Sequence, residues 1–334
     1  MIEIIPYSTE YDPVLEAAAP GKLREMRTHG DVLQDSVRAA VLNGRCLGFG
    51  YLIADEDFRR AAEAEACRAA EAEERAKAEA EDCPADGCPE CHLSLEFQAL
   101  PDAGEMEPEV CAELLASLLD FFDALRESMP DRKPILRTWC GAGKTAYMDF
   151  LMSYGFSAAR PMLVYTRALT EEDRFPALGA HELNQTEPEK TSNRCCVLTK
   201  IHETKLENTD EFSAFLSTME RAFETPESAE NLRYRLADPG TRVFAAYEGE
   251  RIIGGMVTWK TGACAASTEY IFCDPDRQRS GVAERLVRFA FAALRATGVT
   301  HVLLTVYGEN IGAVSLYQKL GYELKSVLIE MQYT

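Results

Sequence analysis

The sequence predicts an α+β protein that contains two copies of one fold, and three observations support this. Residues 269–322 read as a strand, a tight turn, a helix, a second strand and a second helix, because the spacing of their apolar residues changes between strand and helical periods. Residues 92–166 repeat this order of elements. A glycine followed by an aromatic residue stands near the end of both stretches, at Gly155 and Gly321, which are 166 residues apart.

Length and composition are those of a globular protein. The 334 residues are 46% apolar, which is enough for two domains of ordinary size. No apolar run approaches the length that crosses a membrane, and the first residues lack the basic start and apolar core of a signal peptide. The formal net charge of −20 argues against a nucleic-acid or anionic-membrane partner. We therefore expect a cytoplasmic protein whose 11 cysteines are reduced.

The first copy is predicted to span residues 1–170. A short strand at its N-terminus is followed by helices and by a hairpin with the turn Asn43-Gly44. Its later elements are a strand over 92–100, an amphipathic helix over 109–129, a strand over 134–140, a helix over 145–153 and a strand over 162–166.

A charged insertion, residues 55–91, interrupts the first copy. Residues 55–82 are rich in Glu, Ala, Arg and Lys without Gly or Pro, which favours a helix. The cysteine-rich turn that follows offers Cys83, Cys88 and Cys91 as ligands for a structural zinc ion, with His92 adjacent. Neighbouring residues on a strand point to opposite faces, so Cys91 and His92 rarely ligate together. The alternative is a cysteine-rich turn without metal.

The second copy is predicted to span residues 195–334, after a polar linker over 171–194. Its expected elements before the 269–322 stretch are a strand over 195–201, helices over 210–222 and 228–236, and a hairpin of strands over 242–247 and 252–260.

The turn inside the 269–322 stretch is the strongest functional signal. It reads Gln278-Arg279-Ser280-Gly281-Val282-Ala283. The first amides of a helix have no partner within the helix and lie at the positive end of its dipole, so a turn of small residues leaves an anion site. Gly281 and Ala283 let a phosphate approach, and Gln278 and Arg279 add donors at the rim. The spacing matches neither the dinucleotide fingerprint nor the nucleoside-triphosphate loop, and it predicts pyrophosphate binding.

This turn, preceded by Asp274-Pro275, resembles motif A of the GCN5-related N-acetyltransferases (GNAT). The downstream pattern Asn310-x-x-Ala313-x-x-x-Tyr317-x-Lys319-x-Gly321-Tyr322 resembles motif B of the same family. The resemblance covers residues 195–334 well and residues 1–170 by the order of elements alone. It implies that each copy is an acyl-CoA N-acyltransferase fold, a mixed and mostly antiparallel sheet flanked by helices, and that acetyl-CoA is the cosubstrate.

The resemblance also implies roles for individual residues. Tyr317 matches the tyrosine that donates a proton to the leaving sulfur, with a core aromatic as the alternative. Asn310 would contact the coenzyme, and the amides of Ile271 and Cys273 would pair with the pantetheine arm and the carbonyl. Glu269 is the candidate base, because direct attack requires the amine to lose a proton; its alternative is a solvated strand residue.

In the first copy the corresponding positions depart from the motifs. Its expected phosphate turn, residues 102–109, contains Glu105, Glu107 and Glu109, and Leu151 stands in the tyrosine position. We therefore expect a degenerate first copy and a single coenzyme site in the second.

The predicted activity is an N-acyltransferase (EC 2.3.1.-) that moves an acetyl group from acetyl-CoA to a primary amine of a small molecule by direct attack. The rival is a non-catalytic acyl-CoA-binding sensor or scaffold. Arg233, Tyr234 and Trp259 are candidates for the acceptor pocket, with core or surface roles as the alternative.

Overall fold

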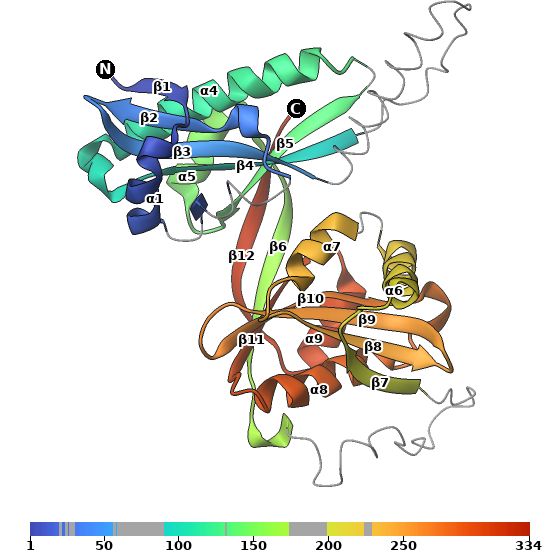
Figure 1. Ribbon diagram of the computed structural model, residues 1–334. Coiled ribbons are helices and arrows are strands. Elements are labelled where there is room, and N and C mark those ends of the chain that lie inside the picture. Colours follow the sequence, from blue (N-terminus) through green and yellow to red (C-terminus); the bar gives the residue numbers. More distant parts are fainter. Residues whose placement is uncertain are drawn as a thin grey trace, which may run out of the picture. The chain divides into compact units, whose positions relative to one another are not determined.

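The computed structural model describes residues 1–19, 22–23, 26, 31–55, 58, 90–130, 132–173, 199–223 and 229–334. These residues form two compact units, each with a β-sheet and helices (Figure 1). Unit 1 contains Met1–Ala159 and Ile329–Thr334, and unit 2 contains Arg160–Leu328. The charged insertion and most of the predicted linker lie outside the described residues.

The sheet of unit 2 is mixed, and only one of its pairings described by register is parallel. From one edge to the other its strands are β6 (Ser157–Ala168), β11 (His301–Tyr307), β10 (Ala265–Cys273), β9 (Arg251–Lys260), β8 (Arg242–Glu248) and β7 (Thr199–Thr204). The parallel pair is β10 with β11, whereas the other four pairs are antiparallel. β12 (Glu323–Tyr333) begins beside β6 in this unit.

Helices cover both faces of the unit 2 sheet. α6 (Thr209–Ala222) and α7 (Ala229–Leu236) lie on one face, while α8 (Val282–Arg295) and α9 (Ile311–Lys319) lie on the other (Figure 1). At the α6 face a Cβ on Gly255 would lie 2.4 Å from both Phe215 and Phe272, so only glycine permits this close packing. Each face buries its own apolar cluster.

The sheet of unit 1 repeats this pattern. Its strands, in order, are β1 (Glu3–Pro6), β2 (Arg38–Leu42), β3 (Arg45–Ala54), β4 (Glu90–Ala99) and β5 (Lys133–Gly141), followed by the end of β12. β4 and β5 pair in parallel, and the earlier pairs are antiparallel. The α-helices with described bounds in this unit are α1 (Asp12–Ala18), α4 (Glu107–Glu127) and α5 (Thr145–Ser153).

The predicted fold class is confirmed by this repeat. In unit 1 a helix joins the parallel strands β4 and β5, as α8 joins β10 and β11 in unit 2. The observed unit boundary differs from the predicted domain boundary at residue 170. β6 enters unit 2 because its residues from Met162 to Ala168 pair with β11, and β12 re-enters unit 1 at Ile329. The two final strands therefore exchange units, a pairing that local sequence patterns do not encode.

Candidate functional site

β10 and β11 run together briefly and then diverge. Their parallel pairing ends at Ser267 opposite Leu303, and no later register pair joins these two strands. On its other edge β10 stays paired with β9, with an irregular register after Glu269. The bulge holds Tyr270 at φ +47°, a left-handed conformation that costs a non-glycine residue roughly 1–2 kcal/mol. One edge of residues 268–273 is thus without a strand partner, next to a strained residue.

Glu269 lies where the two strands diverge. The Ser267 hydroxyl donates a hydrogen bond to its Oε1 at 2.8 Å, and Thr305 of β11 also hydrogen-bonds it. Burial raises the pKa of Glu269 to about 7, although these hydrogen bonds and the charge of Arg235 act in the opposite direction. A carboxyl group with a pKa near neutrality is suited to accept a proton at physiological pH.

Tyr317 of α9 lies within electrostatic range of Glu269. Its side chain is 7% exposed and packs edge-on against Tyr322, with ring centroids 5.8 Å apart. Burial, and after it the charge of Glu269, raise the pKa of Tyr317 far above its ordinary value. Tyr322 has its hydroxyl 2.7 Å from Thr268 Oγ1, whereas the Tyr317 hydroxyl has no hydrogen-bond partner among the described residues. Tyr317 is therefore a protonated donor at neutral pH.

The predicted turn leads into α8 with an open amide end. After η5 (Pro275–Arg277), Arg279 has φ +58° and Gly281, the N-cap of α8, has φ +81°. No side chain caps the helix, so its first amides lack partners. A Cβ on Gly281 would meet no atom of the described chain within 4 Å, so the space beside these amides is open. The turn has the geometry of an anion site.

Other side chains of the turn differ in their surroundings. Gln278 and Arg279 are exposed, as rim donors must be. The Ser280 hydroxyl donates to the carbonyl of Arg277 and so stabilises the turn itself. Val282 is 2% exposed and belongs to the core, so only its backbone faces outward.

A buried carboxylate anchors the turn to the rest of unit 2. Asp274 is fully buried and accepts hydrogen bonds from Arg221 of α6 at 2.9 Å and from Arg251 of β9 at 2.6 Å. Burial alone would raise the pKa of Asp274, but the Asp276 amide and the two arginines outweigh it, so the pKa lies below its ordinary value. In the sequence Asp274 is recognisable only as part of the motif, because its arginine partners are 53 and 23 residues away along the chain.

Negative charge near the helix start is compensated. Glu284, in the first turn of α8, pairs with Lys319 at 2.5 Å and with Arg288 at 3.1 Å. The hydrogen bond from Lys319 is the largest cause that lowers the pKa of Glu284. The side chain of Ala283, between Glu284 and Val282, is half-buried and adds no charge.

The remaining predicted coenzyme residues lie on the elements that border the divergence. Ile271 and Cys273 are half-buried residues of β10, on the segment with the unpaired edge. Burial raises the pKa of Cys273 to about 11, so this thiol is protonated and a poor nucleophile. Asn310 caps α9, since its side-chain oxygen accepts from the Ala313 amide at 3.1 Å.

On the α7 side a different arginine from the predicted one faces the site. Arg233 lies over the Phe212 ring at 4.5 Å, and Tyr234 is 39% exposed. Arg235 instead lies over Trp259 at 4.5 Å and within 5.9 Å of the Tyr270 ring centroid. The helical phase of the short α7 decides which arginine faces inward, and the sequence pattern of eight residues was too short to fix it.

Of the three predicted zinc ligands, one lies within the described residues. Cys83 and Cys88 lie outside the described residues. Cys91, the second residue of β4, is 1% exposed, lies opposite Pro134 of β5 and packs in the core of unit 1. Within the described part of the chain, no three His, Cys, Asp or Glu side chains form a group that could hold a metal ion.

Unit 1 has a turn of the predicted acidic kind. η3 (Pro101–Met106) leads into α4, whose first turn contains Glu107 and Glu109. Leu151, in the position that corresponds to Tyr317, is fully buried. Neither feature offers an anion site or a proton donor.

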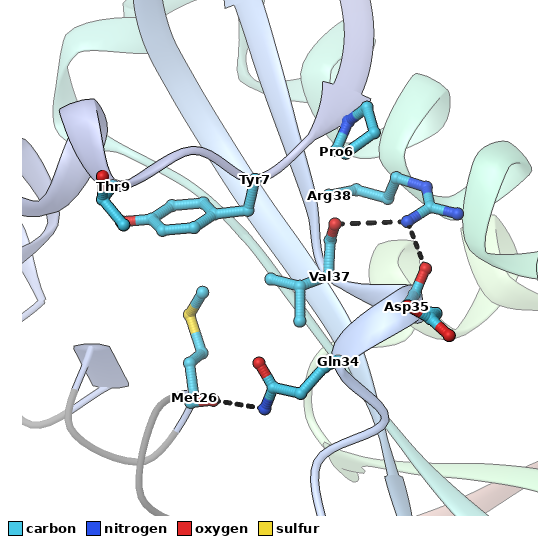
Figure 2. A pocket seen from close by; sticks show the side chains of 8 residues that line it. All are labelled: Pro6, Tyr7, Thr9, Met26, Gln34, Asp35, Val37 and Arg38. Atoms are coloured by element: carbon cyan, nitrogen blue, oxygen red, sulfur yellow. Dashed lines mark hydrogen bonds between the residues drawn. The ribbon is translucent and has the colours of Figure 1, made fainter.

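A cavity of about 370 Å³ lies elsewhere in unit 1 (Figure 2). Its lining residues are Pro6, Tyr7, Thr9, Met26, Gln34, Asp35, Val37 and Arg38. The Gln34 side chain donates to the Met26 carbonyl, and Arg38 donates to the carbonyls of Asp35 and Val37. The cavity contains no residue that the sequence analysis predicted for function, and its polar lining groups bond mainly to the protein backbone.

Comparison with known proteins supports a single class. The profile of the Acetyltransferase (GNAT) family matches residues 208–322. A GCN5-related N-acetyltransferase from Sphaerobacter thermophilus aligns with 99% of this chain and 95% of its own, with TM-score 0.60 and 13% identity. A tandem GNAT protein from the clavulanic acid biosynthesis pathway aligns with 99% of this chain and 98% of its own, with TM-score 0.60 and 12% identity. These two structures share the fold of both units.

Sequence relatives agree with this class. Mycothiol acetyltransferase of Geodermatophilus obscurus is 31% identical over 217 residues, which are 61% of this chain and 64% of that protein. The ribosomal protein bS18-alanine N-acetyltransferase of Escherichia coli strain K12 is 32% identical over 91 residues, which are 24% of this chain and 62% of that enzyme. The matched segments thus span less than two thirds of these relatives. Residues 208–322 thus match the model of the GNAT family, and the fold of the whole chain is similar to that of a tandem GNAT protein.

No helix in the described ranges has both the length and the apolar character needed to cross a bilayer.

Proposed function

We propose that the protein is an N-acetyltransferase that moves an acetyl group from acetyl-CoA to a primary amine of a small molecule, by direct attack within unit 2. One observation carries the proposal: Glu269, a carboxyl group with a pKa near 7, lies where β10 and β11 diverge, and the buried, protonated Tyr317 of α9 lies within electrostatic range of it. An uncapped helix end follows directly after β10.

Glu269 is proposed as the base. The acceptor amine must lose a proton before or as its nitrogen attacks the thioester carbon, and a carboxylate with a pKa near 7 can accept it directly or through a water molecule. As the carbon–nitrogen bond forms, charge develops on the carbonyl oxygen. The amides at the unpaired edge of β10, including those of Ile271 and Cys273, are proposed to stabilise this oxygen and to bind the pantetheine arm.

Tyr317 is proposed as the acid. When the carbon–sulfur bond breaks, the leaving thiolate takes a hydrogen bond or a proton from the tyrosine hydroxyl. The pKa of Tyr317 lies above that of a thiol, so Tyr317 is protonated at the start of every turnover. It therefore stabilises the leaving sulfur mainly by donating a hydrogen bond. The proton that Glu269 accepted balances the reaction when coenzyme A leaves as a free thiol.

The turn before α8 is proposed to bind the pyrophosphate of acetyl-CoA. The residues involved are Gln278, Arg279, Ser280, Gly281, Val282 and Ala283, with backbone amides as the main donors and Asn310 at the start of α9 as a further contact. Two ion-paired arginines hold the base of the turn through Asp274, which limits its motion. A rigid turn loses less conformational entropy when the coenzyme binds.

The test is release of free coenzyme thiol from acetyl-CoA with a panel of small primary amines, together with mass detection of the acetylated amine. The wild type should release thiol only when an amine is present. Glu269→Gln should lose most of this rate, whereas Glu207→Gln, which changes an exposed carboxylate of unit 2, should not. Coenzyme binding without amine-dependent thiol release would instead support an acyl-CoA-binding sensor.

A further inference from the structure

Arg235 is a cation beside the proposed base, and it forms no ion pair with any acid of the described part of the chain. Its guanidinium carbon lies 4.5 Å from the centroid of Trp259 and 5.9 Å from that of Tyr270. Its charge also lowers the pKa of Glu269. Among the described residues, no carboxylate lies within ion-pair distance of Arg235, whereas many other arginines of unit 2 pair with an acid.

Three elements converge on this position. Arg235 comes from the end of α7, Trp259 from β9 and Tyr270 from the bulge of β10. Trp259 of β9 lies opposite Ser267 of β10, so their side chains point to the same face of the sheet. Glu269 is two residues after Ser267 and accepts a hydrogen bond from it, so Glu269 lies on that face too. The aromatic rings, 6.1 Å apart, hold the guanidinium by cation–π contact. Such contact leaves the N–H donors of the guanidinium available, and none of them has an acceptor among the described residues.

We propose that Arg235 binds a carboxylate of the acyl acceptor, so that the acceptor is an amino acid or a related aminocarboxylate. A planar guanidinium donates two parallel hydrogen bonds to a carboxylate, which fixes orientation as well as charge. With the carboxylate on Arg235, the amine of a short aminocarboxylate points toward Glu269. This inference rests on the proposed function, because it names the acceptor of the same site.

A competing role for Arg235 is to tune Glu269 alone. Both roles predict slower turnover when Arg235 is changed, so the rate by itself does not separate them. Tuning affects every acceptor alike and shifts the pH profile. Carboxylate recognition discriminates between an acid and its amide, and the discrimination is lost with the arginine.

The kinetic experiment compares glycine and each L-amino acid with the corresponding carboxamide as acceptors. Rates are expressed per concentration of unprotonated amine, because an amino acid and its amide differ in the pKa of the amine. The wild type should prefer the acid in kcat/KM by about 10- to 100-fold, the range of one charge-assisted pair. Arg235→Gln should remove the preference, mainly through KM. Arg233→Gln is the matched control, because this neighbour on α7 lies over Phe212, and it should keep the preference. Equal use of acid and amide by the wild type would overturn the proposal.

A binding experiment keeps this result separate from the proposed function. The chain has two tryptophans, so the difference between wild type and Trp259→Phe isolates the fluorescence of Trp259. In the presence of coenzyme A, N-acetylglycine should change this fluorescence saturably, N-acetylglycinamide should not, and Arg235→Gln should abolish the response. An equal response to both would contradict carboxylate recognition. Carboxylate binding without thiol release from any amine would contradict the transferase while leaving the carboxylate site in place.

Discussion

Replacing Glu269 by glutamine should stabilise the protein at alkaline pH while it removes activity. The raised pKa means that the fold opposes the charge of this carboxyl group. Between the ordinary pKa and a pKa of about 7, the folded protein keeps the proton and the unfolded chain has released it, so stability falls as the pH rises. One pKa unit corresponds to about 1.4 kcal/mol, so the wild type loses roughly 3 kcal/mol across this interval.

Glutamine has a similar shape and carries no charge at any pH, so the variant avoids this loss. For a unit of this size, each kcal/mol corresponds to roughly 2–4 °C in Tm. We expect Glu269→Gln to melt about 6–12 °C above the wild type at pH 8.5 and only slightly above it at pH 5. Acetyl-CoA identifies the transition of unit 2, because a bound ligand raises its Tm. The exposed control Glu207→Gln should show no such gap.

The pKa of Glu269 should also appear in the pH dependence of the wild-type rate. When kcat/KM is expressed per concentration of unprotonated amine, it should rise about tenfold per pH unit below pH 7 and level off above it, because only the carboxylate accepts the proton. A Tm gap that does not depend on pH, or a Glu269→Gln variant that is less stable at pH 8.5, would refute the argument from burial. A kinetic pKa near 4.5 would refute the assignment of the base.

Two further variants test the acid and the anchor of the turn. Tyr317→Phe keeps the buried ring and removes the hydroxyl, so turnover should fall by about 100-fold while calorimetry gives unchanged acetyl-CoA affinity; unchanged turnover across pH would end the acid role. Asp274→Asn leaves Arg221 and Arg251 without their buried partner, so the Tm of unit 2 and the coenzyme affinity should both fall, with a loss of about 2 kcal/mol in stability. The side chain of Asp276 is 63% exposed, so Asp276→Asn should change the Tm and the coenzyme affinity only slightly. If Asp276→Asn and Asp274→Asn had equal effects, Asp274 would not be the anchor of the turn.

The elements of unit 2 could be predicted because their signals are local. The turn before α8 was recognised from its small residues, and the positive φ of Gly281 agrees with that interpretation. Gly298, with φ +86°, stands just after the end of α8, where a glycine commonly ends a helix. In unit 1 the hairpin turn at Asn43 and Gly44, both with positive φ, follows the same logic. Each of these features depends on a few neighbouring residues.

The parts that were missed depend on contacts between distant residues. The exchange of β6 and β12 between the units follows from strand pairing across more than 100 residues, which no local pattern contains. The bulge at Tyr270 needs the register of β9 as well as that of β10. Arg235, and not Arg233, lies over Trp259, because the rotation of α7 is set by its packing within unit 2. Tertiary packing therefore decides which side chains surround Trp259, whereas the turn before α8 is encoded by neighbouring residues.

The central claim is that one chain binds one acetyl-CoA, at the turn before α8. In unit 1 the corresponding helix start has Glu107 and Glu109 in its first turn, and like charges at short range repel a pyrophosphate by about 1 kcal/mol or more each. Titration calorimetry with acetyl-CoA should give one site per chain, and Gly281→Glu should remove it by placing a carboxylate in the open space beside the amides. Gly298→Glu, at a position with the same sign of φ and equally open space, should leave the site intact. Two sites per chain, or a site that survives Gly281→Glu, would contradict the account.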